Sequence, residues 1–252
     1  MKQNISLSVV IPCYDEMANL QKGVLDKVQH FLQKEKYAYE VIIVDDGSKD
    51  GSIGFIEAFC KENENFSIIK NQHSGKAGAV ATGVLAAKGE IVLFTDMDQA
   101  TPIEELHNFL PFIDKGFDVV IGSRNNRRQG APWTRKFISK SAVVLRKLLV
   151  GLPEISDTQC GFKMFTQKAA NDLFKQLSDI HHGFQVVSGS NVSAGLDMEL
   201  LYLTKKKGYK IKEVPVRWLH VETRRVNPLG SSVAGLIDLL IIKKNIIAGV
   251  YN

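Results

Sequence analysis

Alternation of apolar strand-like runs with helical segments over the first 122 residues is the feature that most constrains the fold. Short runs rich in β-branched residues lie at 7–12, 40–44, 67–69, 91–95 and 118–122. Helical periodicity falls between them, at 19–35, 53–62, 77–87 and from 102 to 110. Such alternation is typical of a mostly parallel sheet with right-handed crossovers. The sequence therefore predicts an α/β fold.

The pattern is less regular after residue 150. We expect strands at 160–165 and 210–218, and helices at 167–177, 196–206 and 232–250. The segment 181–195 is rich in Gly and Ser and predicts a mobile loop. We divide the chain into a main domain, 1–226, and a C-terminal apolar and basic helix, 227–252.

Composition indicates an ordinary globular protein with enough apolar residues for a large core. The chain has 252 residues, of which 44% are hydrophobic and 23% charged. Residues 1–8 lack the apolar core of a signal peptide, and no apolar run reaches the roughly 18 residues that a membrane span needs. The three cysteines are odd in number, lack metal-ligand spacing and suggest reduced thiols, so we expect a cytoplasmic protein.

Charged side chains gather where the predicted parallel strands end, which is where open α/β sheets bind ligands. Asp45 and Asp46 follow one strand, and Arg124 follows another. Asp96 and Asp98 follow a third, in the stretch TDMDQATP. Two carboxylates one residue apart can share a hard divalent cation such as Mg²⁺ or Mn²⁺. The alternative is a solvated turn without function, and the pair alone does not decide between them.

Two common phosphate-binding motifs are excluded. Lys76 follows a glycine but precedes Ala77, and the glycine spacing of a Walker loop is missing. There is no GxGxxG fingerprint after a predicted strand either. The six histidines show no metal-ligand spacing, and we expect the adjacent His181 and His182 to lie on the surface.

A basic block follows the fifth predicted strand. Residues 119–153 contain no acidic residue but eight arginines and lysines. Such a block suits phosphates, nucleic acid or an anionic membrane. A solvated basic helix face is the alternative without function.

An ordered set of motifs carries a family resemblance. SVVIPCYDE, VIIVDDGSKDGS, NQHSGKAGAVATG, TDMDQATP, GSR and DTQCGFKMF occur in this order. Together they resemble family 2 glycosyltransferases, which have a GT-A fold, and in particular the polyprenol-phosphate branch. DTQCGFKMF, GLDMELLYL and IKEVPVRW are similar to the dolichyl-phosphate glucosyltransferase type. The resemblance covers about residues 7–226. It implies that 1–226 is a GT-A catalytic domain with a nucleotide-sugar half, 1–122, and an acceptor half, 123–226.

The resemblance implies a donor site whose residues are Pro12, Tyr14, Glu16, Asp45, Asp46, Lys76, Asp96, Met97, Asp98 and Arg225. Asp45 would face the base, which leaves UDP and GDP both open. Asp96 and Asp98 would hold Mg²⁺ or Mn²⁺, with Asp98 as the more direct ligand. Arg217, Arg224 and Arg225 lie where the family closes a basic loop over the donor diphosphate, and Arg225 matches best.

The acceptor residues that the resemblance implies are Arg124, Arg135, Ser139, Gln159 and Asp197. Arginine suits this role because its planar fork matches phosphate oxygens. The implied catalytic residues are Asp98, Arg124, Arg135 and Asp157. Asp157 could act as a base, bind a sugar hydroxyl, orient an arginine or cap the CGF turn. Asp197 could lie near the acceptor, or only favour the start of its helix.

The resemblance implies an inverting, metal-assisted transfer of a hexose from a nucleotide diphosphate sugar to a polyprenyl phosphate. The alternatives are a glycosyltransferase with a hydroxyl acceptor and a non-catalytic nucleotide-sugar binding module. We expect no nucleic-acid partner and a peripheral position on the cytoplasmic face of a membrane. The C-terminal helix could lie in the bilayer interface or pack into the protein, and the oligomeric state is left open.

Overall fold

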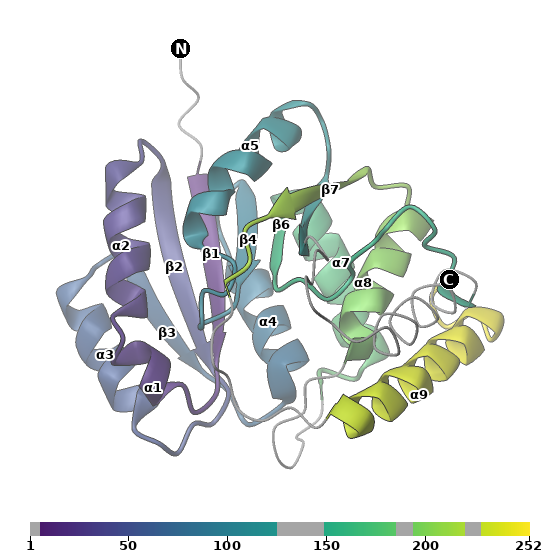
Figure 1. The fold of residues 1–252 in the computed structure, drawn as a ribbon, viewed down its shortest axis with the longest axis horizontal. Coiled ribbons are helices and arrows are strands. Elements are labelled where there is room, and N and C mark those ends of the chain that lie inside the picture. Colours follow the sequence, from purple (N-terminus) through teal and green to yellow (C-terminus); the bar gives the residue numbers. More distant parts are fainter. Residues whose placement is uncertain (1–5, 125–148, 185–193, 220–227) are drawn as a thin grey trace, which may run out of the picture.

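The computed structural model describes residues 6–124, 149–184, 194–219 and 228–252, and it contains a seven-stranded sheet flanked by helices (Figure 1). Its strands are β1 (Ser6–Cys13), β2 (Ala38–Asp45), β3 (Phe66–Lys70), β4 (Ile91–Thr95), β5 (Val119–Arg124), β6 (Phe162–Thr166) and β7 (Ile211–Val216). The helices are α1 (Met17–Leu20), α2 (Val24–Lys34), α3 (Ser52–Glu62), α4 (Gly75–Ala86), α5 (Leu106–Asp114), α7 (Gln167–Ile180), α8 (Ala194–Lys206) and α9 (Pro228–Ile247). A short 3₁₀ turn, Ile103–Glu105, precedes α5.

The strand order is β3-β2-β1-β4-β6-β5-β7, and the predicted mostly parallel sheet is confirmed. β1 pairs in parallel with β2 and β4, and β5 pairs in parallel with β7. β6 is the exception, because it is antiparallel to both β4 and β5. The carboxyl ends of β1, β2, β4, β5 and β7 therefore meet at one edge of the sheet, together with the start of β6.

The sheet is buried on both faces. Alternate residues of β1 show this, since Val9 and Ile11 enter one hydrophobic cluster and Val10 enters the other. The first cluster lies under α1, α2, α3 and α5, and the second lies under α4, α7, α8 and α9. Parallel strands that are covered on both faces read as nearly continuous apolar runs. This explains why these strands were visible in the sequence.

The predicted helix at 19–35 is two helices. α1 ends at Leu20, and α2 starts at Val24. Gly23 lies between them with φ of 71°, in the left-handed region. A residue with a Cβ is strained there, and the turn of backbone at Gly23 interrupts the helical hydrogen bonds. The apolar periodicity continues across the break because both helices pack against the same cluster.

The C-terminal helix α9 has one packed face and one exposed face. Leu239 and Ile242 are buried against the core that contains α8. Ile237, Leu240 and Ile241 are about half exposed. Packing into the protein therefore describes one face of these described residues, and the position in a bilayer interface stays a prediction for the exposed face. In the described part of the chain, no helix is both long and apolar enough to cross a membrane. The division of the chain at residue 226 stays a prediction.

Candidate active site

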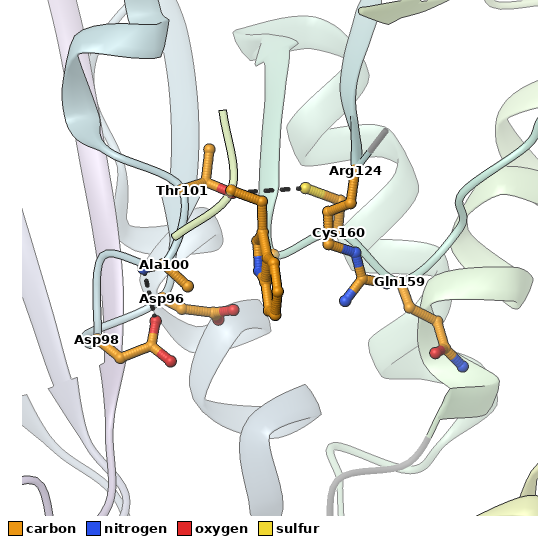
Figure 2. A pocket seen from close by; sticks show the side chains of 9 residues that line it. Asp96, Asp98, Ala100, Thr101, Arg124, Gln159 and Cys160 are labelled. Carbon is orange, nitrogen blue, oxygen red and sulfur yellow. Dashed lines mark hydrogen bonds between the residues drawn. The ribbon is translucent and has the colours of Figure 1, made fainter. Parts of the chain in front are cut away.

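A cavity of about 150 Å³ lies at the carboxyl edge of the sheet (Figure 2). It is formed by the loop after β4, the end of β5, the turn before β6 and the segment after β7. Its lining residues are Asp96, Asp98, Ala100, Thr101, Arg124, Gln159, Cys160, Gly161 and Trp218. Figure 2 shows the two aspartates on one side of the cavity and Arg124 and Gln159 on the other. The cavity therefore places negative charge opposite positive charge.

Asp96 is held between a cation and a glycine. Its Oδ1 lies 2.5 Å from Nζ of Lys76, which belongs to the first turn of α4. Its other oxygen, Oδ2, lies against Gly161, where a Cβ would stand 1.9 Å away. Only a glycine leaves this space for the carboxylate. Nearby carboxylates, Asp96 above all, outweigh the effect of burial and raise the pKa of Lys76, so this lysine stays charged.

Asp98 lies in the tight turn that follows β4. Its Oδ1 accepts a hydrogen bond of 2.9 Å from the backbone N–H of Ala100. Burial raises the pKa of Asp98, and the negative charge of Asp96 adds to this effect. Gln99 completes the turn with φ of 49° and donates from Nε2 to the backbone oxygen of Asp96. Gln99 therefore supports the loop.

The carboxylate pair fits a hard divalent cation. Both aspartates offer oxygen atoms to one cavity, and Mg²⁺ or Mn²⁺ takes such ligands. Among the described residues, no cluster of three or more His, Cys, Asp or Glu forms a closed metal cage. Two carboxylates with further ligands from substrate phosphate and water are a usual arrangement for Mg²⁺. The donor set thus suits a cation that binds together with a diphosphate.

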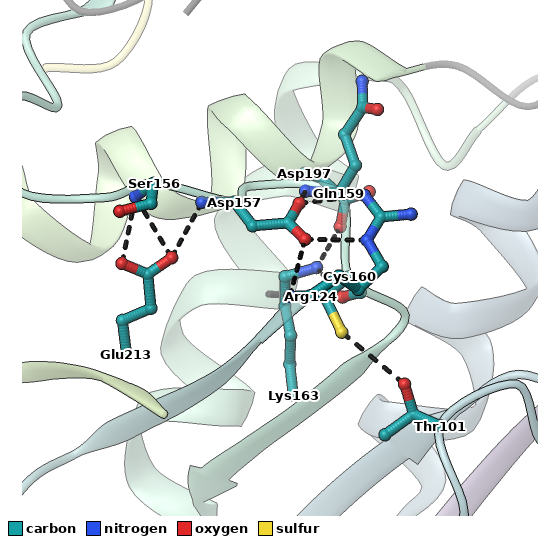
Figure 3. A network of polar contacts seen from close by, with 9 residues as sticks. All are labelled: Thr101, Arg124, Ser156, Asp157, Gln159, Cys160, Lys163, Asp197 and Glu213. Carbon is teal, nitrogen blue, oxygen red and sulfur yellow. Dashed lines mark hydrogen bonds and ion pairs between the residues drawn. The ribbon is translucent and has the colours of Figure 1, made fainter. Parts of the chain in front are cut away.

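Asp157 forms a forked ion pair with Arg124 (Figure 3). Nε of Arg124 donates to Oδ2 of Asp157 at 2.7 Å, and Nη2 donates to Oδ1 at 2.9 Å. The backbone N–H groups of Arg124 and Gln159 donate to the same carboxylate. Glu213 in turn accepts from the backbone N–H of Asp157 at 2.7 Å. The arginine is therefore fixed in direction.

This pairing also sets the charge of both groups. Burial alone would raise the pKa of Asp157, but the hydrogen bonds and charge of Arg124 outweigh it and lower the pKa. The same hydrogen bonds raise the pKa of Arg124. Asp157 is thus ionised near neutral pH and bonded to a cation, which disfavours it as a proton acceptor. Of the four sequence alternatives, arginine orientation and turn capping match the geometry.

A buried lysine lies beneath this network. Lys163 of β6 is fully buried, and its Nζ donates to Oδ1 of Asp197 at 2.6 Å and to the backbone oxygen of Cys160 at 2.7 Å. The ammonium also lies 5.1 Å from the ring centroid of Phe94. Asp197 begins α8, so this ion pair joins the start of that helix to the turn before β6. The preference of acidic residues for the start of a helix therefore does not explain the bond of Asp197 to Lys163.

The predicted base-binding residues lie at the ends of β1 and β2. Asp45 is fully buried, and its Oδ1 accepts from the backbone N–H groups of Gly47 and Ser48. Its Oδ2 is buried without a hydrogen-bond partner among the described residues. Such an orphaned acceptor is costly unless a ligand supplies a donor. Tyr14 stacks on His73 at a centroid distance of 4.3 Å.

Asp46 links the loop after β2 to the start of α4. Its carboxylate accepts from the backbone N–H groups of Ser74 and Gly75, at the start of α4, and from Nδ1 of His73. Pro12 is part of β1, and Glu16 accepts from Asn19 at 2.6 Å. These residues shape the loops around Asp45.

The segment after β7 closes the cavity. Leu219 donates its backbone N–H to the oxygen of Ala100 at 2.7 Å. Arg217 donates to Oε1 of the buried Glu105 at 2.7 Å. Arg217 is therefore bonded to the protein, and its predicted role at the donor diphosphate stays a prediction. Trp218 lies between these two anchors and lines the cavity.

Of the predicted site residues, the structure places Asp96, Asp98, Arg124 and Gln159 around one cavity, and Lys76 and Asp157 contact two of them. Arg135, Ser139, Arg224 and Arg225 lie outside the described residues, so their predicted roles stay predictions. Sequence reasoning missed five residues, although all of them lie in motifs that it used: His73, Gly161, Lys163, Trp218 and Thr101. His182 is exposed, as predicted, whereas His181 is partly buried and bonds to the buried Glu199 at 2.7 Å.

The chain matches the family described as Glycosyl transferase family 2 over residues 8–174. It therefore belongs to this family, and the predicted enzyme class, a glycosyltransferase, is confirmed. Among curated proteins it is similar to dolichyl-phosphate β-glucosyltransferases. The one from Drosophila melanogaster is 32% identical over 98% of this chain and 77% of its own length. The one from Dictyostelium discoideum is 29% identical, with the same coverage of both chains.

Solved structures agree on the fold. A mannosyltransferase from Pyrobaculum calidifontis, solved with GDP-Man and Mn²⁺, superposes with a TM-score of 0.60 over 95% of this chain, at 18% identity. This chain covers 64% of that protein. Mannosyl-3-phosphoglycerate synthase from Rubrobacter xylanophilus superposes with a TM-score of 0.62 over 97% of this chain and 75% of its own, at 13% identity. The predicted GT-A fold is confirmed.

Proposed function

We propose that this protein transfers glucose from a nucleoside diphosphate glucose to a polyprenyl phosphate of the dolichyl type, with inversion at the anomeric carbon. The observation that carries the proposal is the cavity in which Asp96 and Asp98 face Arg124. One wall suits the cation and diphosphate of a donor, and the other suits the phosphate of an acceptor. The similarity to dolichyl-phosphate β-glucosyltransferases supports this choice of sugar and lipid.

Asp96 and Asp98 would hold Mg²⁺ or Mn²⁺ at the donor diphosphate. The cation would supply electrostatic stabilisation of the charge that develops on the leaving diphosphate. Lys76 already compensates one of the two carboxylates and would remain beside the phosphates. Gly161 keeps Asp96 in place, and Gln99 holds the loop in its turn. The assignment is supported by the mannosyltransferase of the same fold, which was solved in complex with Mn²⁺.

Arg124 would bind the acceptor phosphate. Asp157 holds its guanidinium from one side, so the arginine direction is set before the acceptor binds. We assign Asp157 as the residue that orients this arginine. Gln159 lines the same wall and would donate to a sugar or phosphate oxygen. Arg135 and Ser139 would add further contacts to the lipid phosphate.

The reaction needs no general base. A phosphate monoester has a second pKa near ~6 and is largely a dianion at neutral pH. One of its oxygens attacks C1 of glucose, the bond from C1 to the diphosphate oxygen breaks, and the electron pair leaves with the nucleoside diphosphate. The protein then has to align the two substrates and compensate charge. The ion pair between Asp157 and Arg124 is consistent with a reaction in which no side chain has to accept a proton.

Asp45 would receive the base. Its unpartnered Oδ2 can accept a ring N–H, which both uracil and guanine present. The donor is therefore a UDP- or GDP-linked glucose. Tyr14 and His73 form an aromatic stack next to this region and would border the nucleotide.

We place the protein at the cytoplasmic face of a membrane, where a lipid-linked acceptor is reached. The exposed apolar side chains of α9, Ile237, Leu240 and Ile241, lie beside Lys244 in the same helix. Apolar residues next to a basic residue suit an interfacial helix. Flotation with vesicles that contain anionic lipid tests this placement. A variant with Leu240→Lys and Ile241→Lys should lose flotation, whereas Leu85→Lys, at an exposed leucine of α4, should keep it.

The transfer itself is tested with purified protein, Mn²⁺, a polyprenyl phosphate and labelled UDP-glucose or GDP-glucose. The expected product is an acid-labile glucosyl lipid phosphate, absent without the cation and strongly reduced in Asp98→Asn. Stable transfer to a glycan or small-molecule hydroxyl, with none to lipid phosphate, would replace the proposed acceptor. Full transfer in the presence of a chelator would overturn the metal role.

A further inference from the structure

Trp218 is a large aromatic side chain in a cavity that is otherwise lined mainly by polar groups. It follows β7 by two residues and remains 47% exposed. Its lining neighbours include Asp96, Asp98 and Arg124. A tryptophan left accessible beside charged groups does not serve the hydrophobic core. Its position instead suits contact with a ligand in the cavity.

The backbone on both sides of Trp218 is fixed. Before it, Arg217 bonds to the buried Glu105. After it, the N–H of Leu219 bonds to the oxygen of Ala100, two residues beyond Asp98. The second bond attaches the tryptophan segment to the turn that carries the carboxylate pair. The backbone at Trp218 therefore keeps its place relative to the turn of Asp96 and Asp98, which lowers the ordering cost when a ligand binds.

The cavity presents two kinds of surface to a ligand. Carboxylates, Arg124, Gln159 and Thr101 offer polar groups, while the indole offers a flat apolar face. A pyranose ring matches this combination, because its hydroxyl groups form a polar rim and its C–H bonds form apolar faces. In glucose the hydroxyl groups at C2, C3 and C4 are all equatorial, so neither face of the ring is interrupted at these three carbons. Galactose and mannose each have one axial hydroxyl that interrupts a face.

We propose that Trp218 packs against the face of the donor glucose ring and favours glucose over an epimer with an axial hydroxyl. This inference rests on the proposed function for the identity of the sugar, and it adds a specificity-determining residue to that site. Trp218 touches the sugar, whereas Arg217 and Leu219 act as positioning residues. The base is bound elsewhere, because Asp45 and Tyr14 are not part of the cavity lining.

The first experiment measures binding, independently of any acceptor. The chain has two tryptophans, so Trp133→Phe leaves Trp218 as the single indole emitter. In this variant with Mn²⁺, glucose-linked UDP or GDP should change the emission much more than UDP or GDP alone. An equal change with and without the sugar would overturn the proposal.

The second experiment measures donor kinetics in the natural chain. A contact as strong as an aromatic pair corresponds to roughly three- to tenfold in an equilibrium constant. Trp218→Ala should raise the donor KM by about this factor. It should also reduce, by a similar factor, the preference in kcat/KM for UDP-glucose over UDP-galactose or for GDP-glucose over GDP-mannose. Trp218→Phe should restore part of both effects. Leu85→Ala, at an exposed leucine of α4 that does not line the cavity, is the control and should leave both unchanged.

The outcomes separate the two proposals. An unchanged donor KM and an unchanged epimer ratio in Trp218→Ala would overturn the role of Trp218, whatever the acceptor. Sugar-dependent emission in Trp133→Phe, together with no transfer to polyprenyl phosphate by the wild-type protein, would overturn the proposed function and leave the role of Trp218 supported.

Discussion

Gly161→Ala is the sharpest test of the carboxylate site. A Cβ at this position would stand 1.9 Å from Oδ2, 2.4 Å from Cγ and 2.7 Å from Oδ1 of Asp96. Real Cβ atoms essentially never approach closer than 3.0 Å, so the two groups must separate by at least about 1 Å. One of them has to move.

The surroundings decide which group moves. Gly161 precedes the fully buried Phe162, and β6 is paired with a strand on each side. The side chain of Asp96 is 35% exposed and can rotate toward solvent. We therefore expect the sheet to stay intact and the carboxylate to be displaced. A misplacement of about 1 Å in a catalytic group can cost roughly 100-fold in rate.

The assay compares glucosyl transfer, Mn²⁺ affinity and thermal unfolding in two alanine variants. Gly161→Ala should lower kcat/KM by about 100-fold and weaken Mn²⁺ binding, while its Tm stays close to that of the wild type. Gly54→Ala is the matched control, because a Cβ in α3 meets nothing within 4 Å there. It should keep full activity and have a slightly higher Tm than the wild type, since alanine favours a helix more than glycine does. Activity of Gly161→Ala within about twofold of the wild type would refute the argument, because a displaced metal ligand would then cost far less than ~100-fold.

Three further substitutions test the ion pairs. Asp157→Asn should lower the free energy of unfolding at neutral pH. Because the pKa of Asp157 is depressed in the folded protein, the difference from the wild type should shrink as the pH falls below 3.8, the ordinary pKa of an aspartate. His181→Gln should do the reverse: Glu199 raises the folded pKa of His181, so its contribution to unfolding free energy is full below pH 6.5 and disappears as pH rises through the folded pKa. A pH-independent difference would contradict either expectation. Lys163→Met should cost about 3–5 kcal/mol in urea unfolding by leaving a carboxylate unpaired, and the added change Asp197→Leu should recover part of it.

Much of the fold and part of the site were predictable because parallel strands buried on both faces leave an unmistakable apolar pattern. β4 was predicted with its observed bounds, and the polar strand ends after β1, β2, β4 and β5 do meet at one edge. The proximity of Asp96 to Arg124 follows from this topology alone. Helix breaks were less visible, because Gly23 interrupts α2 and α1 without interrupting their apolar stripe.

The remainder depends on contacts between segments far apart in the sequence. Nothing local indicates that Lys163 is fully buried, since lysine in a short strand normally faces solvent. The ion pair with Asp197 forms only when α8 packs beside β6. Trp218 is a similar case, because the bond from Leu219 to Ala100 joins segments more than a hundred residues apart. Side-chain roles of this kind require the tertiary structure.

The insertion of β6 between β4 and β5 has a consequence for synthesis of the chain. When the first 124 residues have left the ribosome, β4 is an open edge, and β5 has neither of its neighbours in the described sheet. Both gaps are filled only after residues 162–166 emerge, and β7 follows still later. An unpaired, apolar strand edge invites association with other chains. The nascent protein therefore passes through an aggregation-sensitive interval that ends when β6 enters the sheet.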